Sequence, residues 1–440
     1  MHAVENTGAD FFRSHVNGML GLTGGSACPT LGAAPSQECP VPTERRGKMV
    51  KTPHTICFSG DLVKGVTSMA DWERIRAEFP ALQKWTYLNT ATFGQSPVRA
   101  REAMARHWDR RDESACADFL AWFDDMDRLR ASCARLVNGE ATDIAFVPSA
   151  AAGLALLIQG LDWKAGDEVL TLENEFPNQI YASAALSRTG AVHRVVRWEE
   201  FHESVNERTR LVALSTVNYA TGFRPPVEEV ARFLERRGAL LYLDGTQSVG
   251  ALRIDVQEVR PAMLSVDAYK WLMAPNGAGF VYVSPRLRPS LAPTVVGWRS
   301  DRNWRQVDCL NHGAPEFAES AEKYEGGWIP LAPLYGMGAT VDWELELGPE
   351  AIEARVLELA GKTRAMLSGL GAEVNRDESQ IVTAWFPDRD AAALARVLKE
   401  KRILVSARHG RLRVSPHFYN NEEDLERLRA ALRVAASQLE

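Results

Sequence analysis

The sequence has no long hydrophobic run and no long block of charge of one sign. No apolar stretch approaches the roughly 18 residues that a membrane-spanning helix needs, so we expect no membrane partner. Basic residues number 51 and acidic residues 57, and the formal net charge of −6 is spread along the chain. Proteins that bind nucleic acid concentrate Lys and Arg in a patch or stripe, so we expect no nucleic-acid partner either.

Cysteine is also scarce, with six residues in a chain of 440. Their spacings contain no CxxC pair of the kind that builds a zinc site, so no metal site is predicted. Few cysteines, and a start without the charged and apolar regions of a secretory signal, favour a cytoplasmic setting. The signatures GxGxxG and GxxxxGK[ST] are missing as well, which argues against a dinucleotide-dependent oxidoreductase and a P-loop nucleotidase.

The chain divides into segments of different character. Residues 1–68 are rich in Gly, Pro, Ala and Ser and lack periodicity, which is typical of a disordered leader. Over 91–332, strand-like runs alternate with helical ones, which predicts an α/β domain with a large, mainly parallel sheet and helices on both faces. Residues 333–440 read as a smaller α+β C-terminal domain, which the segment 69–90 joins.

Two charged residues interrupt apolar sequence in the predicted large domain. Asp244 directly follows the buried strand of ALLYLDGTQSVG, and the carboxyl end of such a strand is where open α/β sheets bind ligands. Lys270 stands 26 residues later in VDAYKWLMAP, between two aromatic residues, where partial desolvation would make its amine nucleophilic. Taken singly, the aspartate could merely cap a turn, and the lysine could reach out to water.

One cofactor requires both groups in a single pocket. Pyridoxal 5'-phosphate takes a lysine as its Schiff base and an aspartate as the partner of its pyridinium nitrogen. The stretch FVPSAAAG ends a predicted strand and opens a helix with Ser149, Ala150 and Ala151, whose backbone N–H groups and small side chains suit a phosphate. An ordinary helix cap would have the same sequence.

Further motifs extend this pattern along most of the chain. In order they are YLNTATFGQSP, ENEFPNQIY, STVNYATG, LDGTQSVG, AYKWLMAPNGAGFVYV and GRLRVSPHFYNNEEDLERL. With them, residues 85–435 resemble a fold-type I pyridoxal-phosphate enzyme of the class V aminotransferase superfamily, which includes cysteine desulfurases, isopenicillin N epimerase-like proteins, kynureninases and C–S lyases. The resemblance implies an amino-acid substrate and a homodimer with its active site at the subunit interface.

The resemblance also implies roles for individual residues. Lys270 would carry the Schiff base and remove the Cα proton, Asp244 would face the pyridine nitrogen, and Arg413 would hold the substrate carboxylate, a task that suits a guanidinium fork. The other candidates bind the ring, its hydroxyl, the phosphate or the substrate: Phe176, Asn218, Tyr219, Gln247, Tyr269 and Asn89.

Two positions depart from the family pattern. Asp267 stands three residues before the lysine, where relatives often have a hydroxyl residue, and an ionised carboxylate there cannot help to bind phosphate. Trp328 occupies the position from which many relatives supply a threonine to the neighbouring subunit's phosphate. These departures leave the details of the phosphate site and of the dimer contact open.

The reaction itself stays open between several alternatives. A cysteine desulfurase needs a thiolate shortly before the carboxylate-binding arginine, and residues 399–416 contain no cysteine. Cys309 lies in a loop elsewhere, where we expect a free thiol. Transamination, β-elimination by a C–S lyase and epimerisation all begin with removal of the Cα proton, and a non-catalytic protein that retains the pyridoxal-phosphate fold is the alternative from another class.

Overall fold

This computed structural model describes residues 71–438. The predicted leader over residues 1–68 lies outside the described residues. All the described residues fall within one compact unit, so the boundaries predicted at 90/91 and 332/333 remain predictions. No helix in the described part of the chain is long and apolar enough to cross a membrane.

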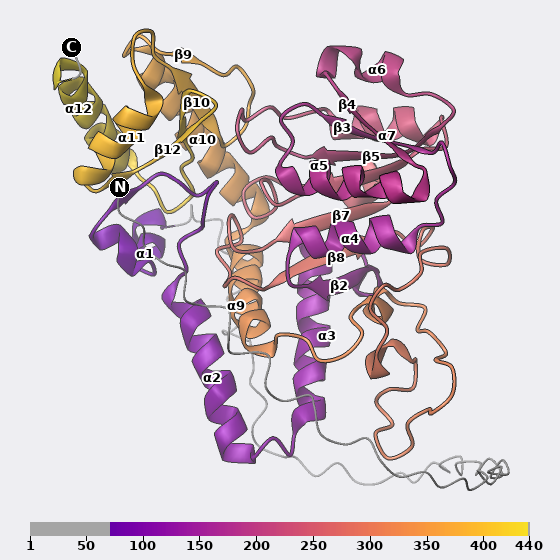
Figure 1. Cartoon of the computed structure of the whole chain (residues 1–440). Coiled ribbons are helices and arrows are strands. Elements are labelled where there is room, and N and C mark those ends of the chain that lie inside the picture. The colour runs from indigo at the N-terminus through magenta and orange to yellow at the C-terminus, as the bar shows by residue number, and fades with distance from the viewer. Residues whose placement is uncertain (1–70, 439–440) are drawn as a thin grey trace, which may run out of the picture. The chain divides into compact units, whose positions relative to one another are not determined.

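A seven-stranded sheet lies at the centre of the first two thirds of the described chain (Figure 1). In spatial order its strands are β2 (Ile144–Val147), β8 (Gly279–Val283), β7 (Met263–Asp267), β6 (Leu240–Asp244), β5 (Thr209–Ser215), β3 (Glu168–Leu172) and β4 (Val192–Val196). Strands β7 to β4 are parallel, whereas β8 runs antiparallel to both of its neighbours. The prediction of a mainly parallel sheet is therefore confirmed.

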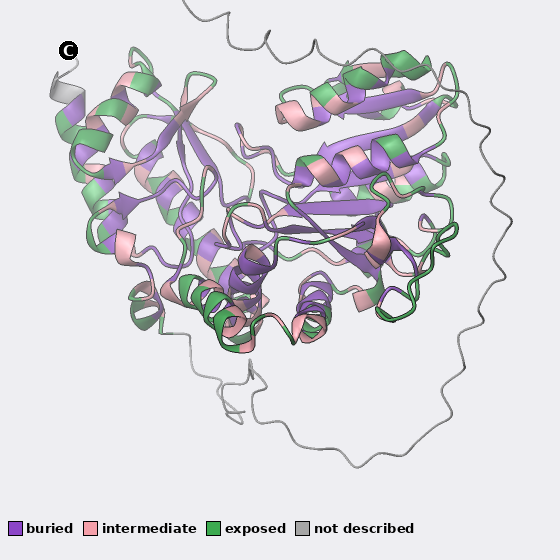
Figure 2. Cartoon of the chain, turned by 60° about the horizontal axis from the view of Figure 1, so that its bottom comes forward, coloured by how far each residue is buried: buried purple, intermediate pink, exposed green. Residues whose placement is uncertain are grey.

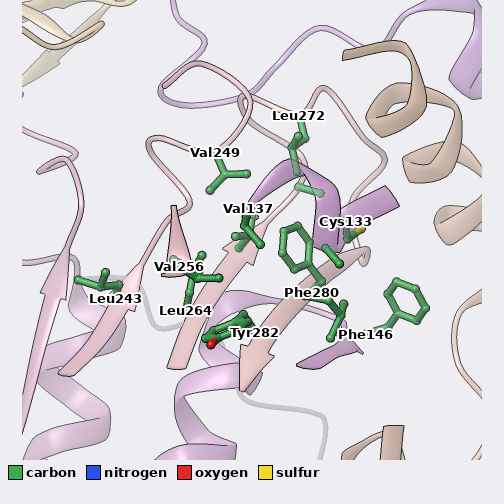
Figure 3. Packing of buried hydrophobic residues seen from close by; sticks show 14 of the residues in the cluster. Cys133, Val137, Phe146, Leu243, Val249, Val256, Leu264, Leu272, Phe280 and Tyr282 are labelled. Carbon is green, nitrogen blue, oxygen red and sulfur yellow. The ribbon is translucent and has the colours of Figure 1, made fainter. Parts of the chain in front are cut away.

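Helices cover both faces of this sheet because successive residues of each strand point to opposite sides. Leu241 and Leu243 of β6 belong to one apolar cluster, and Tyr242 between them belongs to the other. Figure 3 shows part of the first cluster, with Leu243, Leu264 and Phe280. Helices that pack into the first cluster include α3 (Phe119–Leu136), α7 (Val227–Glu235), α8 (Val256–Val259) and α9 (Leu331–Leu347), and the second cluster includes residues of α4 (Ala150–Gly160) and α5 (Pro177–Ala184).

Short elements and one long helix complete this part of the molecule. Helix α2 (Val98–Ser114) packs along α9. The remaining elements here are α1 (Trp72–Arg76), α6 (Phe201–Ser204) and the 3₁₀ turns η1 (Pro80–Gln83), η2 (Ala141–Asp143), η3 (Ala185–Thr189), η4 (Trp198–Glu200), η5 (Trp298–Ser300) and η6 (Ala321–Tyr324). Figure 2 shows most of the central sheet buried and the outer faces of the helices exposed, while the edge strand β4 has exposed residues.

The C-terminal part is built on two small sheets. A four-stranded antiparallel sheet has the order β12 (Ser406–Arg408), β13 (Arg411–Val414), β10 (Val382–Trp385) and β9 (Glu373–Val374). Strand β1 (Thr86–Tyr87) pairs in parallel with β11 (Ile403–Leu404), which places the start of the described chain beside its end. A separate apolar cluster unites strands β9 to β13 with α10 (Pro349–Ser368), α11 (Ala391–Glu400) and α12 (Glu422–Gln438).

Candidate active site

Asp244 and Lys270 lie at the carboxyl ends of neighbouring parallel strands. Asp244 is the last residue of β6, and Lys270 stands in the turn three residues after Asp267, the last residue of β7. Because β6 and β7 pair in parallel, both ends meet at one edge of the sheet. The strand end predicted for Asp244 and its proximity to Lys270 are thus present in the structure.

The Lys270 side chain is buried among aromatic rings. It is 7% exposed, and its Nζ lies 5.5 Å from the ring centroids of both Phe176 and Tyr269. Burial lowers the pKa of Lys270 to about 8, although Asp244 and Asp267 oppose the shift. At pH 7 roughly a tenth of an amine with this pKa is neutral, whereas an exposed lysine is almost entirely protonated, so Lys270 is the better nucleophile and base near neutral pH.

The Asp244 carboxyl group is buried, with a backbone donor beside it. Its Oδ1 accepts a hydrogen bond of 2.9 Å from the N–H of Thr246. Burial raises the pKa of Asp244, while the Thr246 bonds and the Lys270 charge counteract that effect. A buried carboxylate with one such bond can still accept a hydrogen bond from a protonated nitrogen.

A close backbone crossing holds the lysine turn in place. The N–H of Gly94 donates to the carbonyl of Tyr269 at 2.9 Å. A Cβ at Gly94 would come within 1.8 Å of the Lys270 carbonyl oxygen. Only glycine permits this approach, which ties the loop after β1 to the turn that carries the nucleophile.

The Arg413 guanidinium is buried and bonded only to neutral oxygens. Its Nε donates to Ser406 Oγ at 3.1 Å, Nη1 to the carbonyl of Tyr219 at 2.5 Å and Nη2 to Thr92 Oγ1 at 2.6 Å. Within the described residues no carboxylate pairs with it, and it is 1% exposed. Burial lowers the pKa of Arg413 to about 9, and the charge of Arg408 adds to the effect. A buried cation without an anion favours an anionic ligand.

The predicted substrate residue Asn89 connects to Arg413 through one hydroxyl group. Thr92 donates its Oγ1–H to Asn89 Oδ1 at 2.9 Å while it accepts from Arg413. An isolated bridge pairs Asn89 with Ser415, two residues beyond Arg413. The structure therefore brings these two candidates together, with Thr92 as an intermediary that the sequence analysis did not identify.

Two of the predicted ring-binding residues are already engaged within the protein. Asn218 donates through Nδ2 to the carbonyl of Asn174 and accepts from the N–H groups of Ala220 and Thr221, so its side chain holds the turn together. Tyr219 places its ring edge against Phe176, with centroids 5.1 Å apart. Tyr219 supports the predicted stacking residue, and Asn218 shapes the loop between them.

Gln247 is likewise engaged in hydrogen bonds inside the protein. Its Nε2 donates to the carbonyl of Ala91 at 3.0 Å, and its Oε1 accepts from Trp271 Nε1 at 2.9 Å. One Nε2 hydrogen therefore remains for an outside acceptor. The amide also links the Asp244 segment to the residue that follows Lys270.

The N-terminus of α4 carries both the predicted phosphate donors and a competing acid. Ser149 caps the helix, because its Oγ accepts from the N–H of Ala152 at 3.2 Å. The Asp267 carboxyl group accepts a hydrogen bond from the Ala150 N–H, and burial raises the pKa of Asp267 to about 6, a shift to which Asp244 also contributes. Asp267 therefore occupies one of the backbone N–H groups at the positive end of the helix that a phosphate would use.

Glu175 is a buried acid at this edge of the sheet that the sequence analysis missed. Its carboxyl oxygens accept bonds of 2.8 and 2.5 Å from the N–H and hydroxyl of Ser215, the last residue of β5. Burial, supported by the nearby Asp244 charge, raises the pKa of Glu175 to about 7. Its place directly before Phe176 in ENEFP is the signal that could have identified it.

Other sequence features lie away from these residues. Trp328 is 59% exposed and lines an apolar cavity of about 480 Å³ together with His107 and Trp122 of α2 and α3. The expectation of a free thiol at Cys309 is wrong, because Cys309 is disulfide-bonded. In the described part of the chain, no group of three or more His, Cys, Asp or Glu side chains has the arrangement of a metal site.

Comparison with protein families decides the class of this site. The model of the aminotransferase class-V family matches residues 116–436. The chain belongs to this family. Class V aminotransferases use pyridoxal phosphate, so the predicted cofactor and the predicted enzyme class are both confirmed.

Individual members of the family differ in their reactions. The isopenicillin N epimerase of Streptomyces clavuligerus is 27% identical over 83% of this chain and 98% of its own length. A probable cysteine desulfurase of Methanothermobacter thermautotrophicus is 23% identical over 81% of this chain and 96% of its own length. A solved cystine C–S lyase structure has a TM-score of 0.75 and 24% identity over 80% of this chain and 98% of its own, which confirms the fold.

The residues present in this class V enzyme fit pyridoxal phosphate. A buried lysine amine, a buried carboxyl group and an aromatic ring beside the amine correspond to the aldehyde, the ring nitrogen and the ring face of the cofactor. The start of α4 offers backbone N–H groups with only methyl side chains at Ala150 and Ala151. Asp267 at the same helix end is the one feature that opposes the fit.

Proposed function

We propose that this enzyme removes the Cα proton of an amino-acid substrate, with Lys270 as the covalent attachment point of the cofactor and as the base. Pyridoxal phosphate supplies an aldehyde that binds amines and a ring that accepts electrons when a bond at Cα breaks. The observation that carries the proposal is the buried Lys270 amine, with its lowered pKa, beside the Phe176 ring. These properties suit an amine that exchanges protons near neutral pH.

The surrounding residues orient the reacting groups. Asp244 would keep the pyridine nitrogen protonated through a charge-assisted hydrogen bond, and Phe176 would stack on the ring. Arg413 would bind the substrate carboxylate through the guanidinium hydrogens that Ser406, Tyr219 and Thr92 leave unused, which fixes the Cα proton relative to Lys270. The hydrogen that remains on Gln247 Nε2 would be donated in a hydrogen bond to the ring oxygen of the cofactor.

The phosphate would be held at the start of α4. Backbone N–H groups of Ala150 and Ala151 point out of the helix end, and Ser149 caps it. Tyr269, whose ring lies beside Lys270, would donate its hydroxyl group. Binding there requires Asp267 to become protonated or to turn away from the Ala150 N–H.

Transamination is the reaction that we propose. Persulfide transfer needs a reactive thiolate, and neither free cysteine of the described chain suits that role. Cys133 is fully buried and burial raises the pKa of its thiol, while Cys116 lies on the cavity wall beside Trp328. Relatives named as an epimerase and as desulfurases show that the family supports other outcomes, which product analysis distinguishes.

A homodimer is part of the same proposal. Trp108 and Trp328 are 52% and 59% exposed, and both line the apolar cavity between α2, α3 and residues 328–333. Exposed aromatic surface that gathers in one place is typical of a contact with another chain. Sedimentation of the holoenzyme would give the mass of two chains, and the single-chain mass would contradict this part.

The function is tested with cofactor-saturated protein and a panel of amino acids. Borohydride reduction followed by peptide mapping should find the cofactor on the Lys270 side chain. Mass spectrometry should find a keto acid and the aminated cofactor in equal amounts. A keto acid with free ammonia would indicate elimination, and an inverted amino acid would indicate epimerisation, so either result would replace transamination. An unmodified Lys270 would overturn the proposal as a whole.

A further inference from the structure

Four side chains of the C-terminal sheet share the face that carries Arg413. Strands β12 and β13 are antiparallel, with Ser406 opposite Arg413 and Arg408 opposite Arg411. Directly opposed residues and residues two apart on a strand lie on the same face of a sheet. Arg413 on this face donates to the carbonyl of Tyr219 and to Thr92 Oγ1, so the Arg413 end of the face is directed to the candidate active site.

The three arginines on this face differ in their partners. Arg411 pairs with Glu373 at 3.1 Å. Arg413 is the proposed carboxylate-binding residue. Arg408 is half-buried and donates to the carbonyl of Ala407 at 2.7 Å. Within the described residues, no carboxylate forms an ion pair with Arg408.

Strand register places Arg408 near the Arg413 guanidinium. Arg408 lies two residues along β12 from Ser406, which accepts a hydrogen bond from Arg413, and its charge contributes to the lowered pKa of both Arg413 and Lys270. The next residue, His409, lies 3.4 Å through its Nε2 from the Tyr219 hydroxyl group, at the ring that packs against Phe176. The turn after β12 therefore lies beside the site, although His409 itself is exposed.

We propose that Arg408 determines substrate specificity by binding a second acidic group, so that the substrate is an amino acid whose side chain ends in a carboxylate. The inference rests on the proposed function, since Arg413 must already hold the α-carboxylate. Two guanidinium groups near one another repel, and a single carboxylate neutralises only one of them. A side-chain carboxylate would form a charge-assisted, two-pronged bond with Arg408 and remove the remaining repulsion.

The test compares matched pairs of ligands on the holoenzyme. L-aspartate is compared with L-asparagine, and L-glutamate with L-glutamine, by titration of the cofactor absorbance band to obtain Kd. The wild-type protein should bind the acidic member of at least one pair about 10- to 100-fold more tightly than the amide. Arg408→Gln should abolish this preference and leave the Kd of the amide within about twofold.

Arg411→Gln is the matched control. It removes an arginine from the same face of the same sheet, but one whose charge Glu373 already neutralises, so both Kd values should stay unchanged. Equal wild-type affinity for acid and amide, or equal weakening of both by Arg408→Gln, would overturn the inference while leaving the proposed function standing. If none of the four amino acids perturbs the cofactor band, the inference fails, whereas the wider amino-acid panel and the borohydride mapping of Lys270 decide the proposed function separately.

Discussion

Arg413 and Thr92 are 321 residues apart in the sequence and are joined by a hydrogen bond of 2.6 Å from Nη2 to Oγ1. The threonine hydroxyl accepts from the arginine and donates to Asn89, so its direction is fixed at both ends. A buried arginine keeps its orientation only if its donors are satisfied. Thr92 is therefore a positioning residue for the group that we expect to bind the substrate carboxylate.

Replacing Thr92 with valine removes this acceptor while the volume stays nearly the same. We expect Thr92→Val to raise KM for the amino-acid substrate about 5- to 10-fold, because the guanidinium loses one anchor. The value of kcat should change less than about twofold, since Lys270 is not disturbed. Thr92→Ser, which retains the hydroxyl, should restore KM. A fall in kcat at constant KM would contradict the positioning role.

The lowered pKa of Lys270 predicts how the apoprotein captures its cofactor as pH changes. The neutral amine is the form that reacts with an aldehyde, and with a pKa of about 8 its fraction rises between pH 6 and 9 and then levels off. Stopped-flow absorbance after mixing apoprotein with pyridoxal phosphate measures this rate. A rate that keeps rising to pH 10 would show that Lys270 has the pKa of a solvent-exposed lysine.

Lys270→Ala is the control for that experiment. It should bind the cofactor without a covalent bond, give no labelled peptide after borohydride treatment and lose activity by at least about 10²-fold.

The raised pKa of Asp267 leads us to expect a second pH effect. Cofactor affinity should fall as pH rises, whereas the rate of capture by Lys270 rises. With a pKa of about 6, its carboxyl group is ionised above that pH and repels phosphate at the start of α4. Wild-type affinity for pyridoxal phosphate should therefore fall as pH rises through 6, apart from any covalent contribution of Lys270. Asp267→Asn should bind about 3- to 10-fold more tightly at pH 7.5.

The measurement for Asp267 is equilibrium dialysis in the Lys270→Ala background, which removes the covalent step from both proteins. Inorganic phosphate serves as the competitor that reports on the helix end alone. Identical affinities of the aspartate and asparagine proteins between pH 5.5 and 8 would show that the carboxylate turns away from the phosphate.

The close packing at Gly94 leads us to expect that a larger residue there lowers both the stability of the protein and the amount of cofactor bound. A Cβ there would meet the Lys270 carbonyl at 1.8 Å, and backbone cannot move aside cheaply. Gly94→Ala should destabilise the protein by about 1–3 kcal/mol and lower the bound cofactor, because the lysine turn must shift. Thermal unfolding and the cofactor-to-protein absorbance ratio measure the two effects.

Gly361→Ala in α10 is the matched control, since nothing lies within 4 Å of the Cβ it would add. It should stabilise the protein slightly, by about 0.5–1 kcal/mol, because alanine favours the helix. Cofactor content should not change. Equal destabilisation by both substitutions would mean that the Gly94 crossing has no special role.

Local patterns in the sequence were sufficient for the alternation of strands and helices and for the strand end at Asp244. A run of buried aliphatic residues that ends in a carboxylate reports a strand and its terminus by itself. The pattern did not predict β7 (Met263–Asp267) as the strand that delivers Lys270, nor that β8 runs antiparallel. Strand direction depends on how the chain returns across the sheet, which no window of a few residues contains.

What the sequence by itself determined is the chemistry: one lysine, one strand-end aspartate and one arginine in motifs of the right order. Only the tertiary structure decided the partners of these groups. It pairs the Gln247 amide with Ala91, 156 residues away, and seats Asp267 on the Ala150 N–H. Among residues 71–438 it gives Arg408 no carboxylate partner. The reason is physical: buried polar groups take whatever donors and acceptors packing brings to them, and packing joins residues that are distant in the chain.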